Sequence, residues 1–598
     1  MICLIYKSYF INLLFDSLFP RITFKNKSIW GSYMTEQAKK IIRKHALLNA
    51  FRYGKAEPGK IIGKVLGEEP DLKNDMDSLK SWIGDAVVEV NKLSEEQIKK
   101  ELEENSPDML EKKEETKKDL PDLKEISRQV VMRFEPSPSG PLHIGHAYVL
   151  GLIAEYARRY KAKLILRLAD TNPANIDTIS YDQIPKDAEW LTDGGVSEVI
   201  VQSDNLETYY QHARDMIEKG HAYICTCSAE EFRELAQRKE ECSCRGNTSE
   251  KNAELWKMMS TKFKEGEAVM RFKTDMKHKN PAMRDFPLMR INDDEHPRQG
   301  KKYRVWPLMN FSVAVDDYEQ GMTHILRAKD HADNAKRQEY IQHAMGWPVP
   351  QTQFVGRINF LDLEVSCSKT RARIDKGEFD NWDDIRLPFL MAMKRRGFQP
   401  GAFIRYSLSV GVSLSDKKVS NDEFFKALYA FNKDMIDPVS NRYFFVDQPV
   451  EVVIEGAPEQ DIELDLHPDN KKGGRIFNAD DRFFLAKSDL DSIKEGELVR
   501  LMDCFNIRKK EEKLLFDSLD YEKYKGNGKK IIHWLPAGKR DDLFEVEVIM
   551  PDNSRVTGLG EEAMKKLKTG DIVQLERFGF CRLDEEQGNR LIFWFAHK

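Results

Sequence analysis

Cysteine is scarce in this chain, with only 8 in 598 residues. A disulfide scaffold of this length would need more of them, so the disulfide-rich class of secreted protein is excluded. Long apolar runs are also missing, and no stretch is long and apolar enough to span a membrane. We therefore predict a protein of a reducing compartment, cytoplasmic, without a membrane partner.

An excess of one charge is equally absent. The 94 Lys and Arg against 99 Asp and Glu give a net charge of −5. Global charge thus does not indicate nucleic-acid binding, and any such site has to be a local basic face. The Gly-X-Gly-X-X-Gly fingerprint does not occur either, which disfavours the dinucleotide fold of dehydrogenases.

The length predicts several domains. Residues 1–33 are expected to be a non-native or disordered extension. Their apolar part is interrupted by Lys7 and Asp16 and lacks a basic segment or cleavage site, whereas Met34 opens a helical pattern. The other expected parts are a helical domain (34–125), an α/β domain with a parallel sheet (126–375) containing an insertion (about 220–310), a helical connector (376–440) and a β-barrel region (441–598).

The most informative motif is His143-Ile-Gly-His146, which stands in a Pro- and Gly-rich turn that starts at Glu135. An apolar strand is expected before this turn (130–134) and an amphipathic helix after it (147–160). Free N–H groups and the helix dipole favour an anion at such a helix start. Two imidazoles there can donate to phosphate oxygens in a transition state. The alternative is a helix cap with one packed imidazole.

The second motif is Val365-Ser-Cys-Ser-Lys-Thr-Arg371, expected as a flexible loop after a strand over residues 354–358. Its lysine can supply a mobile cation to a departing pyrophosphate, a role that Mg²⁺ would share. Alone, Ser-Lys-Thr is most often an ordinary surface loop. Its value comes from the pairing with the histidine motif upstream.

Four stretches carry a resemblance to a known family: residues 134–146, 166–173, 316–331 and 366–370. Together they resemble the class I aminoacyl-tRNA synthetases of the glutamyl/glutaminyl branch, specifically the archaeal-type glutamyl-tRNA synthetases. The similarity extends from about Gln129 to the C-terminus. It implies an α/β fold: a Rossmann-like catalytic domain, an acceptor-binding insertion, a helical connector and antiparallel anticodon-binding barrels.

The resemblance also implies a reaction. Glutamate and ATP, with Mg²⁺, give glutamyl-adenylate, and the acyl group then moves to the 3′ end of tRNA(Glu) or also of tRNA(Gln). The implied catalytic residues are His143, His146 and Lys369. The implied ATP-binding residues are Ser137, Gly145, His146, Arg357, Ile358, Ser368 and Lys369.

Arg327 is the residue most closely tied to substrate choice. Glutamyl enzymes of the family carry arginine at the matching position, and a buried substrate carboxylate needs such a cation with bidentate donors. Arg133 resembles the family's second substrate-binding arginine. The alternative for Arg327 is a structural salt bridge to Asp330 or Asp317.

Two positions depart from the family pattern. Ala169 stands where an acid usually contacts the substrate ammonium, and Met309 opens a segment that usually carries a tyrosine. We hypothesise that a neighbouring carboxylate, Asp170 or Glu135, takes over the ammonium.

Two Cys-X-Cys pairs, Cys225 with Cys227 and Cys242 with Cys244, are separated by fourteen residues. Four thiolates in two close pairs suit tetrahedral Zn²⁺, and some relatives resemble this chain in carrying zinc in the acceptor-binding insertion. The alternative is four reduced cysteines without metal.

Basic clusters in the C-terminal half are expected to follow a tRNA backbone, above all Lys394, Arg395 and Arg396. Each cluster alone is more often a solvated face. Aromatic residues such as Phe580 and Trp534 can stack on anticodon bases, although core packing is the more frequent role.

Three other functions compete with glutamate–tRNA ligation. A glutaminyl-tRNA synthetase is disfavoured by Arg327. A nucleotidyltransferase is disfavoured by the 366–370 motif and the long barrel region. A tRNA-binding paralogue without activity would account for Ala169 and Met309, but the intact His143, His146 and Lys369 argue against it.

Overall fold

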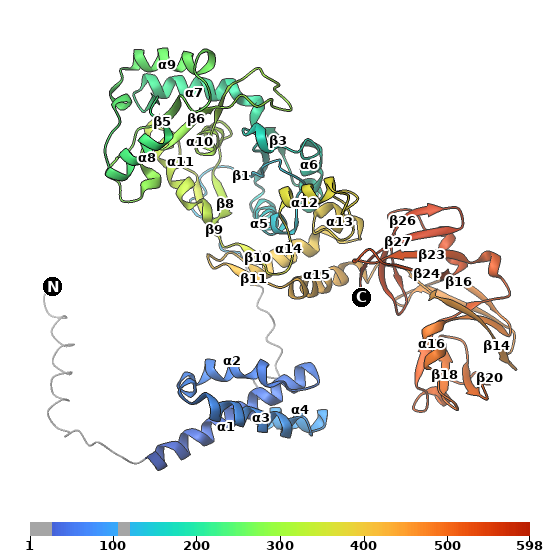
Figure 1. Ribbon diagram of the computed structural model, residues 1–598. Coiled ribbons are helices and arrows are strands. Elements are labelled where there is room, and N and C mark those ends of the chain that lie inside the picture. The colour runs from blue at the N-terminus through green and yellow to red at the C-terminus, as the bar shows by residue number, and fades with distance from the viewer. Residues whose placement is uncertain (1–26, 106–119) are drawn as a thin grey trace. The chain divides into compact units, whose positions relative to one another are not determined.

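The computed structural model describes residues 27–105 and 120–598, and it divides the chain into two compact units, Met1–Lys117 and Lys118–Lys598 (Figure 1). Most of the expected extension, residues 1–26, lies outside the described residues. Helix α1 begins at Lys27 and runs without a break through Met34. Among the described residues, no helix has the length and apolar character that a membrane crossing requires.

The described part of the first unit is a bundle of helices. These are α1 (Lys27–Tyr53), α2 (Pro58–Glu68), α3 (Met76–Val90) and α4 (Glu95–Asn105), with a short 3-10 turn between α2 and α3. On α3, Leu79, Ile83, Val87 and Val90 are buried at helical spacing, so one face of the helix packs into the core. Asp75 caps this helix by accepting a hydrogen bond from Ser78 N.

The second unit starts with the parallel sheet that the sequence predicts. Strands β1 (Val131–Phe134), β2 (Lys163–Leu168) and β3 (Glu198–Val201) pair in parallel, as do β8 (His324–Ala328) and β9 (Gln351–Val355). Thr323 N donates to Val131 O, so β8 lies beside β1. Helices α5 (Ile144–Tyr160) and α6 (Ser180–Leu191) follow β1 and β2. The sheet thereby gathers the carboxyl ends of β1, β2 and β8 at one edge.

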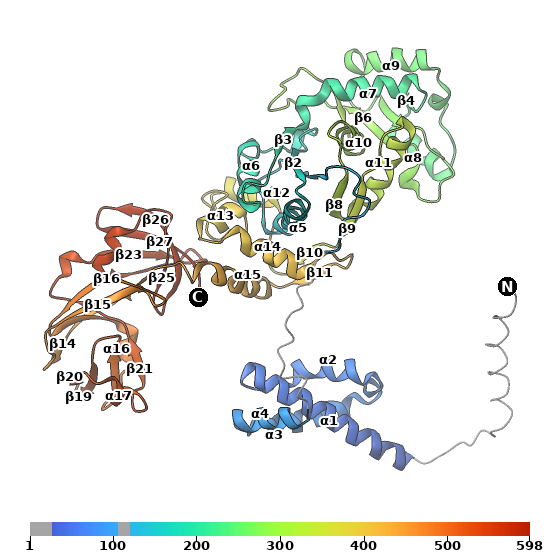
Figure 2. The same ribbon diagram turned by 180° about the vertical axis from the view of Figure 1, so that it is seen from behind.

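An antiparallel sheet interrupts this parallel pattern. Strands β4 (Ala222–Cys225), β5 (Val269–Phe272), β6 (Pro287–Ile291) and β7 (Val305–Pro307) pair in sequence order. They are accompanied by α7 (Leu206–Glu218), α8 (Ala229–Arg238) and α9 (Ser249–Thr261) (Figure 2). The chain then returns through α10 (Met309–Glu319) and α11 (Ala332–Met345), which bring the site residues of the next section to the main sheet.

Helices α12 (Cys367–Asp375), α13 (Leu390–Arg395), α14 (Pro400–Val410) and α15 (Asn421–Ile436) follow. Helix α14 packs closely on α5, because Ser407 Oγ donates to Ala147 O at 3.3 Å. A Cβ atom on Gly151 would lie 2.6 Å from that hydroxyl oxygen, so glycine permits this approach. A short parallel pair, β10 (Ile358–Phe360) with β11 (Lys417–Val419), joins the segment before α12 to the segment between α14 and α15.

The C-terminal region contains two seven-stranded sheets that each nearly close. In one, β12 (Arg442–Tyr443) and β13 (Phe445–Asp447) form opposite edges although a single residue separates them. In the other, β21 (Lys530–Ile532) and β22 (Leu535–Pro536) take the same positions. Such closure removes exposed strand edges, as in a barrel. Both sheets also contain parallel pairs, which the alternation of strands and turns did not predict.

Two arginines at the end of α13 attach the connector to the last two strands, β26 (Gly579–Gln587) and β27 (Arg590–His597). Arg396 is 3% exposed and donates to the carbonyl oxygens of Phe595 and Ala596 at 3.2 and 2.9 Å. Arg395 forms a bidentate pair with Asp584 at 2.9 and 2.6 Å. Both guanidinium groups are therefore structural links between α13 and the sheet.

Arg396→Ala should destabilise the protein by about 2–4 kcal/mol, because it leaves two buried carbonyl oxygens without donors and opens a cavity. Urea unfolding followed by tryptophan fluorescence measures this loss. The control is the exposed neighbour Lys394, whose replacement by alanine should change the free energy of unfolding by less than about 0.5 kcal/mol. An unchanged unfolding midpoint for Arg396→Ala, with weaker tRNA binding, would contradict the structural role.

Candidate functional site

The turn that contains the two histidines is built by the start of α5. His143 is the N-cap residue, and its Nδ1 accepts from Gly145 N at 3.0 Å. His146 Nδ1 accepts in return from His143 N at 3.3 Å. The two rings stack with centroids 3.8 Å apart. Because each Nδ1 accepts a hydrogen bond, we infer that each neutral ring carries its proton on Nε2.

Both histidines are held in the neutral form. Burial lowers the pKa of His146 to about 4, and burial together with the neighbouring His146 lowers the pKa of His143 well below its ordinary value. The turn therefore offers two N–H donors rather than two cations near neutral pH. Neutral donors suit an oxyanion whose charge develops during a reaction.

Helix α12 lies against this turn. Arg371 Nη2 donates to Ser139 O at 2.8 Å, and a Cβ atom on Gly140 would lie 2.9 Å from Cys367 Cβ. Lys369 is exposed on the same helix and pairs with Glu364 at 2.9 Å. The expected flexible loop over residues 365–371 is thus wrong from Cys367 onward, because the segment forms the first turns of a helix.

The remaining nucleotide-site predictions fall around the same turn. Ser137 and Ser368 are exposed, and β10 begins at Ile358. Arg357, also exposed, pairs with Asp330 and donates its backbone N–H to Asp416 at 2.9 Å. A Cβ atom on Gly145 would lie 4.0 Å from the ring of Phe360. The structure therefore brings β10, α12 and the histidine turn together.

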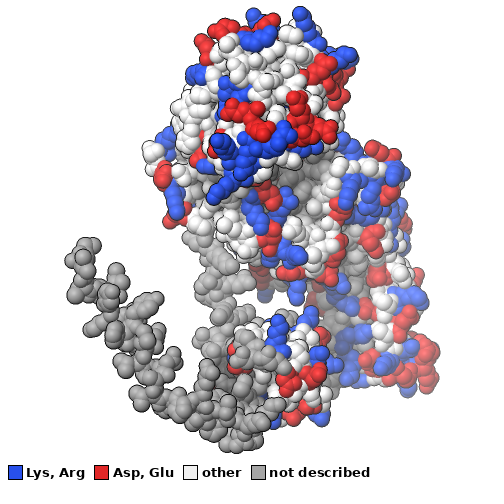
Figure 3. Space-filling model, turned by 60° about the vertical axis from the view of Figure 1, so that its left-hand side comes forward, with Lys and Arg blue, Asp and Glu red and all other residues white. Residues whose placement is uncertain are grey.

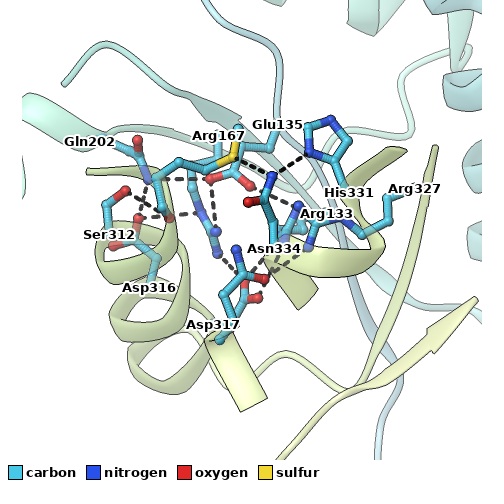
Figure 4. A network of polar contacts seen from close by, with 12 residues as sticks. Arg133, Glu135, Arg167, Gln202, Ser312, Asp316, Asp317, Arg327, His331 and Asn334 are labelled. Atoms are coloured by element: carbon cyan, nitrogen blue, oxygen red, sulfur yellow. Dashed lines mark hydrogen bonds and ion pairs between the residues drawn. The ribbon is translucent and has the colours of Figure 1, made fainter. Parts of the chain in front are cut away.

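A network of buried charges lies where β1 and β2 meet α10 (Figure 4). Arg133 contacts Asp317 at 2.7 Å and Glu135 at 2.8 Å. Arg167 is fully buried and contacts Asp317 at 2.9 Å and Glu135 at 3.1 Å. Burial alone would raise the pKa of Asp317, but the guanidinium groups of Arg133 and Arg167 outweigh burial and lower it. These two arginines are thus fully engaged with carboxylates of the protein.

Arg327, on β8, differs from its two neighbours. Only 8% of it is exposed, yet no carboxylate of the described chain forms an ion pair with it. Among the described residues, its guanidinium makes one hydrogen bond, from Nη1 to Gln338 Oε1 at 2.8 Å, and its Nε is buried without an acceptor. Burial, and then repulsion from Arg133, lower its pKa to about 10, so the group still carries its charge at neutral pH. The alternative of a salt bridge from Arg327 to Asp330 or Asp317 is not formed.

Asp170 lies among hydrogen-bond donors of the protein. It is 1% exposed, and its carboxylate accepts from Ser203 N at 2.8 Å, Ser203 Oγ at 2.7 Å and Tyr181 OH at 2.7 Å. These bonds hold the segment after β3 in place. Contact of Asp170 with a substrate stays a prediction.

Three polar residues of this region were missed by the sequence analysis. Gln338 and Asn310 each bury a polar side-chain atom, Nε2 and Oδ1, for which the described residues offer no partner. Asp187 is 2% exposed and accepts from Leu142 N, directly before the histidine motif, at 3.2 Å. No sequence motif predicts these residues, because they stand out by the burial of their polar atoms and not by residue type.

The four cysteines predicted to bind metal meet at one point. Their sulfur atoms all lie within 4.8 Å of one another, with Cys225 3.9 Å from Cys242 and Cys227 3.8 Å from Cys244. Zinc–sulfur bonds of about 2.3 Å in a tetrahedron would separate the sulfurs by roughly 3.8 Å. Thr226 N also donates to the sulfur of Cys244 at 3.4 Å, a contact that would stabilise a metal-bound thiolate.

The predicted tRNA contacts in the connector need correction. Arg396 is buried against the last sheet, and Lys394 is exposed. Arg395 pairs with Asp584, but 38% of its side chain stays exposed. Phe580 and Trp534 are fully buried core residues. On the face shown in Figure 3, Lys and Arg are intermixed with Asp and Glu. The basic clusters in the sequence overestimate the basic surface, because several of their arginines form hydrogen bonds or ion pairs within the protein.

Comparison with known families gives three matches along the chain. A model described as the catalytic domain of class I tRNA synthetases (E and Q) matches residues 129–438. Two models described as anti-codon binding domains of the same class match residues 440–517 and 531–584. The fold and the site therefore define a class I tRNA synthetase of the glutamate and glutamine class.

Individual relatives narrow this assignment. The glutamate--tRNA ligase of Methanobrevibacter smithii is 44% identical, covering 94% of this chain and 99% of that protein. The glutamate--tRNA ligases of Methanothermobacter thermautotrophicus and Pyrococcus abyssi are 43% and 42% identical, covering 93% and 94% of this chain and 99% and 100% of theirs. The chain belongs to the glutamate--tRNA ligase family. This membership excludes the nucleotidyltransferase alternative.

The buried carboxyl of Asp187 should leave a pH signature in stability. Burial raises its pKa from 3.8 to about 7, so the folded protein binds a proton that the unfolded chain has already released. The contribution of Asp187 to stability is therefore greatest below pH 4 and is lost as the pH rises through 7. Asp187→Asn stays neutral and should be more stable than the parent protein at pH 8, by about 1–4 kcal/mol.

Urea unfolding between pH 4 and 8 measures this difference, which should shrink toward zero at the acidic end. A difference between the two proteins that is constant over that range would show that Asp187 does not titrate as inferred.

Proposed function

We propose that this chain attaches L-glutamate to the 3′ end of tRNA(Glu), at the expense of ATP and through glutamyl-adenylate. One observation carries the choice of amino acid: Arg327 is a buried guanidinium without a carboxylate partner in the described chain, 8% exposed and hydrogen-bonded only to a neutral amide. An uncompensated buried charge is costly, and a substrate carboxylate relieves that cost. Nothing in the site favours the glutaminyl alternative.

We expect ATP to bind as its Mg²⁺ complex, with its phosphates contacted by the histidine turn and by α12. The α-carboxylate of glutamate attacks the α-phosphorus, and the bond to pyrophosphate breaks. His143 and His146 donate their Nε2 protons as hydrogen bonds to phosphate oxygens, and Lys369 exchanges Glu364 for the leaving pyrophosphate. A ribose hydroxyl of the tRNA then attacks the acyl carbon, and AMP leaves. Ser137, Gly145, Arg357, Ile358 and Ser368 line the nucleotide.

For the substrate ammonium, we assign Glu135 and Asn310. The carboxylate of Glu135 lies between Arg133 and Arg167, and it contributes to the electrostatics of Arg327. Asn310 supports the role with a buried Oδ1 that has no donor among the described residues. It follows Met309 in the segment that departs from the family pattern. Arg133 then acts on the substrate indirectly, by holding Glu135.

The outer regions receive tRNA in this proposal. The antiparallel sheet β4–β7 with its helices takes the acceptor end, and the two nearly closed sheets take the anticodon, in line with the two anti-codon binding models that match there. The cysteine cluster fits Zn²⁺ by its spacing and donor set. Bound zinc would tie the end of β4 to the segment before α9 and supply structure rather than chemistry.

The activity is tested by charging both tRNA(Glu) and tRNA(Gln) transcripts with labelled glutamate. The protein should charge tRNA(Glu), and Arg327→Met should raise the KM for glutamate by about 10²-fold, because the side-chain carboxylate loses its only unshared cation. The control is Arg337→Met, on α11, which changes a half-buried arginine bonded to Ala282 O. Absence of glutamate charging by the parent protein would refute the proposed function.

Metal content tests the cysteine cluster separately. Protein purified without chelator should contain about one zinc per chain, and Cys242→Ser should lose the metal and lower the unfolding temperature. The matched control is Cys504→Ser, a buried cysteine outside the cluster, which should keep the zinc. Stoichiometric zinc in Cys242→Ser, or none in the parent protein, would contradict the site.

A further inference from the structure

We propose that Gln338 is a specificity-determining residue, which orients Arg327 and donates its own amide N–H to the side-chain carboxylate of glutamate. This inference rests on the proposed function and adds a second protein donor to the same subsite. Gln338 lies on α11, eleven residues after Arg327 in the sequence, and is 3% exposed. No sequence motif had singled it out.

The hydrogen bonds of the pair are incomplete in a specific way. Gln338 Oε1 accepts from Arg327 Nη1 at 2.8 Å. The other end of the amide, Nε2, is buried and finds no acceptor in the described part of the chain, and the same holds for Arg327 Nε. Two neighbouring side chains thus each retain a buried donor and lack an acceptor. Buried donors in native proteins are nearly always satisfied, so the pair points to a ligand that supplies acceptors.

A carboxylate is the ligand that these donors fit. It offers two oxygens with several lone pairs and carries the negative charge that Arg327 lacks. The carboxylates nearest in the network, Glu135 and Asp317, are already bonded to Arg133 and Arg167. They lower the cost of burying positive charge here without forming an ion pair with Arg327.

The neutrality of Gln338 is what preserves selectivity. Its amide oxygen fixes the guanidinium in place but adds no negative charge, so the charge of Arg327 stays available for the substrate. A glutamate at this position would form an ion pair with Arg327 and cancel that charge. A glutamine substrate, by contrast, would place an NH₂ group against a subsite made of donors and leave them unpaired. Gln338 and Arg327 therefore exclude glutamine together.

Gln338→Glu tests the charge argument in tRNA charging with glutamate and with glutamine. We expect the KM for glutamate to rise by about 100-fold, with little change in kcat, because the new carboxylate competes with the substrate for Arg327. The ratio of kcat/KM for glutamate over glutamine should fall by about tenfold or more. Gln338→Met, similar in volume but without polar atoms, should also raise the KM for glutamate. It reports on the site if Gln338→Glu fails to fold.

The matched control is Gln342→Glu, one turn further along α11. Gln342 is also 3% exposed, so its replacement buries the same charge in the same helix, at a position for which no hydrogen bond to Arg327 is found among the described residues. It should lower the unfolding temperature and leave the glutamate-to-glutamine ratio unchanged. Two results would overturn the inference. One is an equal fall in the glutamate-to-glutamine ratio of kcat/KM for Gln338→Glu and Gln342→Glu. The other is an unchanged KM for glutamate in both Gln338→Glu and Gln338→Met.

Glutamate charging by the parent protein separates a failure of the proposed function from a failure of the role of Gln338. If the parent protein does not charge tRNA with glutamate, the proposed function fails. If it does, and the Gln338 variants keep the glutamate KM and selectivity, only the role of Gln338 fails.

Discussion

The site depends on the way positive charge is buried without being fully neutralised. Three arginines, Arg133, Arg167 and Arg327, lie in one region. Glu135, directly after β1, and Asp317, on α10, form ion pairs with only the first two. The paired arginines join the main sheet to α10, and breaking such a buried ion pair is costly, so this part of the site is held in place. Arg327 has no carboxylate partner among the described residues, so its positive charge is not neutralised by an ion pair.

The histidine turn follows the same logic with neutral groups. His143 and His146 satisfy the backbone donors at the start of α5 with their Nδ1 atoms, and burial keeps both rings uncharged. The cap uses only Nδ1, so each ring keeps an Nε2 donor. Capping and the proposed donation to phosphate are therefore compatible roles of the same two side chains.

Much of the fold was readable from local pattern, and much of the site was not. Strand β1 and helix α5 end where the sequence analysis expected them to end and differ from expectation by one to three residues at their starts. Burial partners escaped prediction because they come from distant segments. Arg395 meets Asp584, 189 residues later, and Arg167 meets Asp317 after 150 residues. Sequence shows that a side chain is charged but not which protein groups surround it, and so the buried partners of Asp170 and Arg396 were not foreseen.

The attachment of α13 to β27 limits how this enzyme can be taken apart. Arg396 receives its acceptors from carbonyl groups close to the C-terminus, and Asn432 on α15 contacts His597 at 3.0 Å. A catalytic fragment excised before residue 440 would carry an orphaned guanidinium and an exposed apolar seam. Recombinant dissection of the enzyme would therefore have to rebuild that seam, and a swap of anticodon modules between relatives would have to bring its matching last strand along.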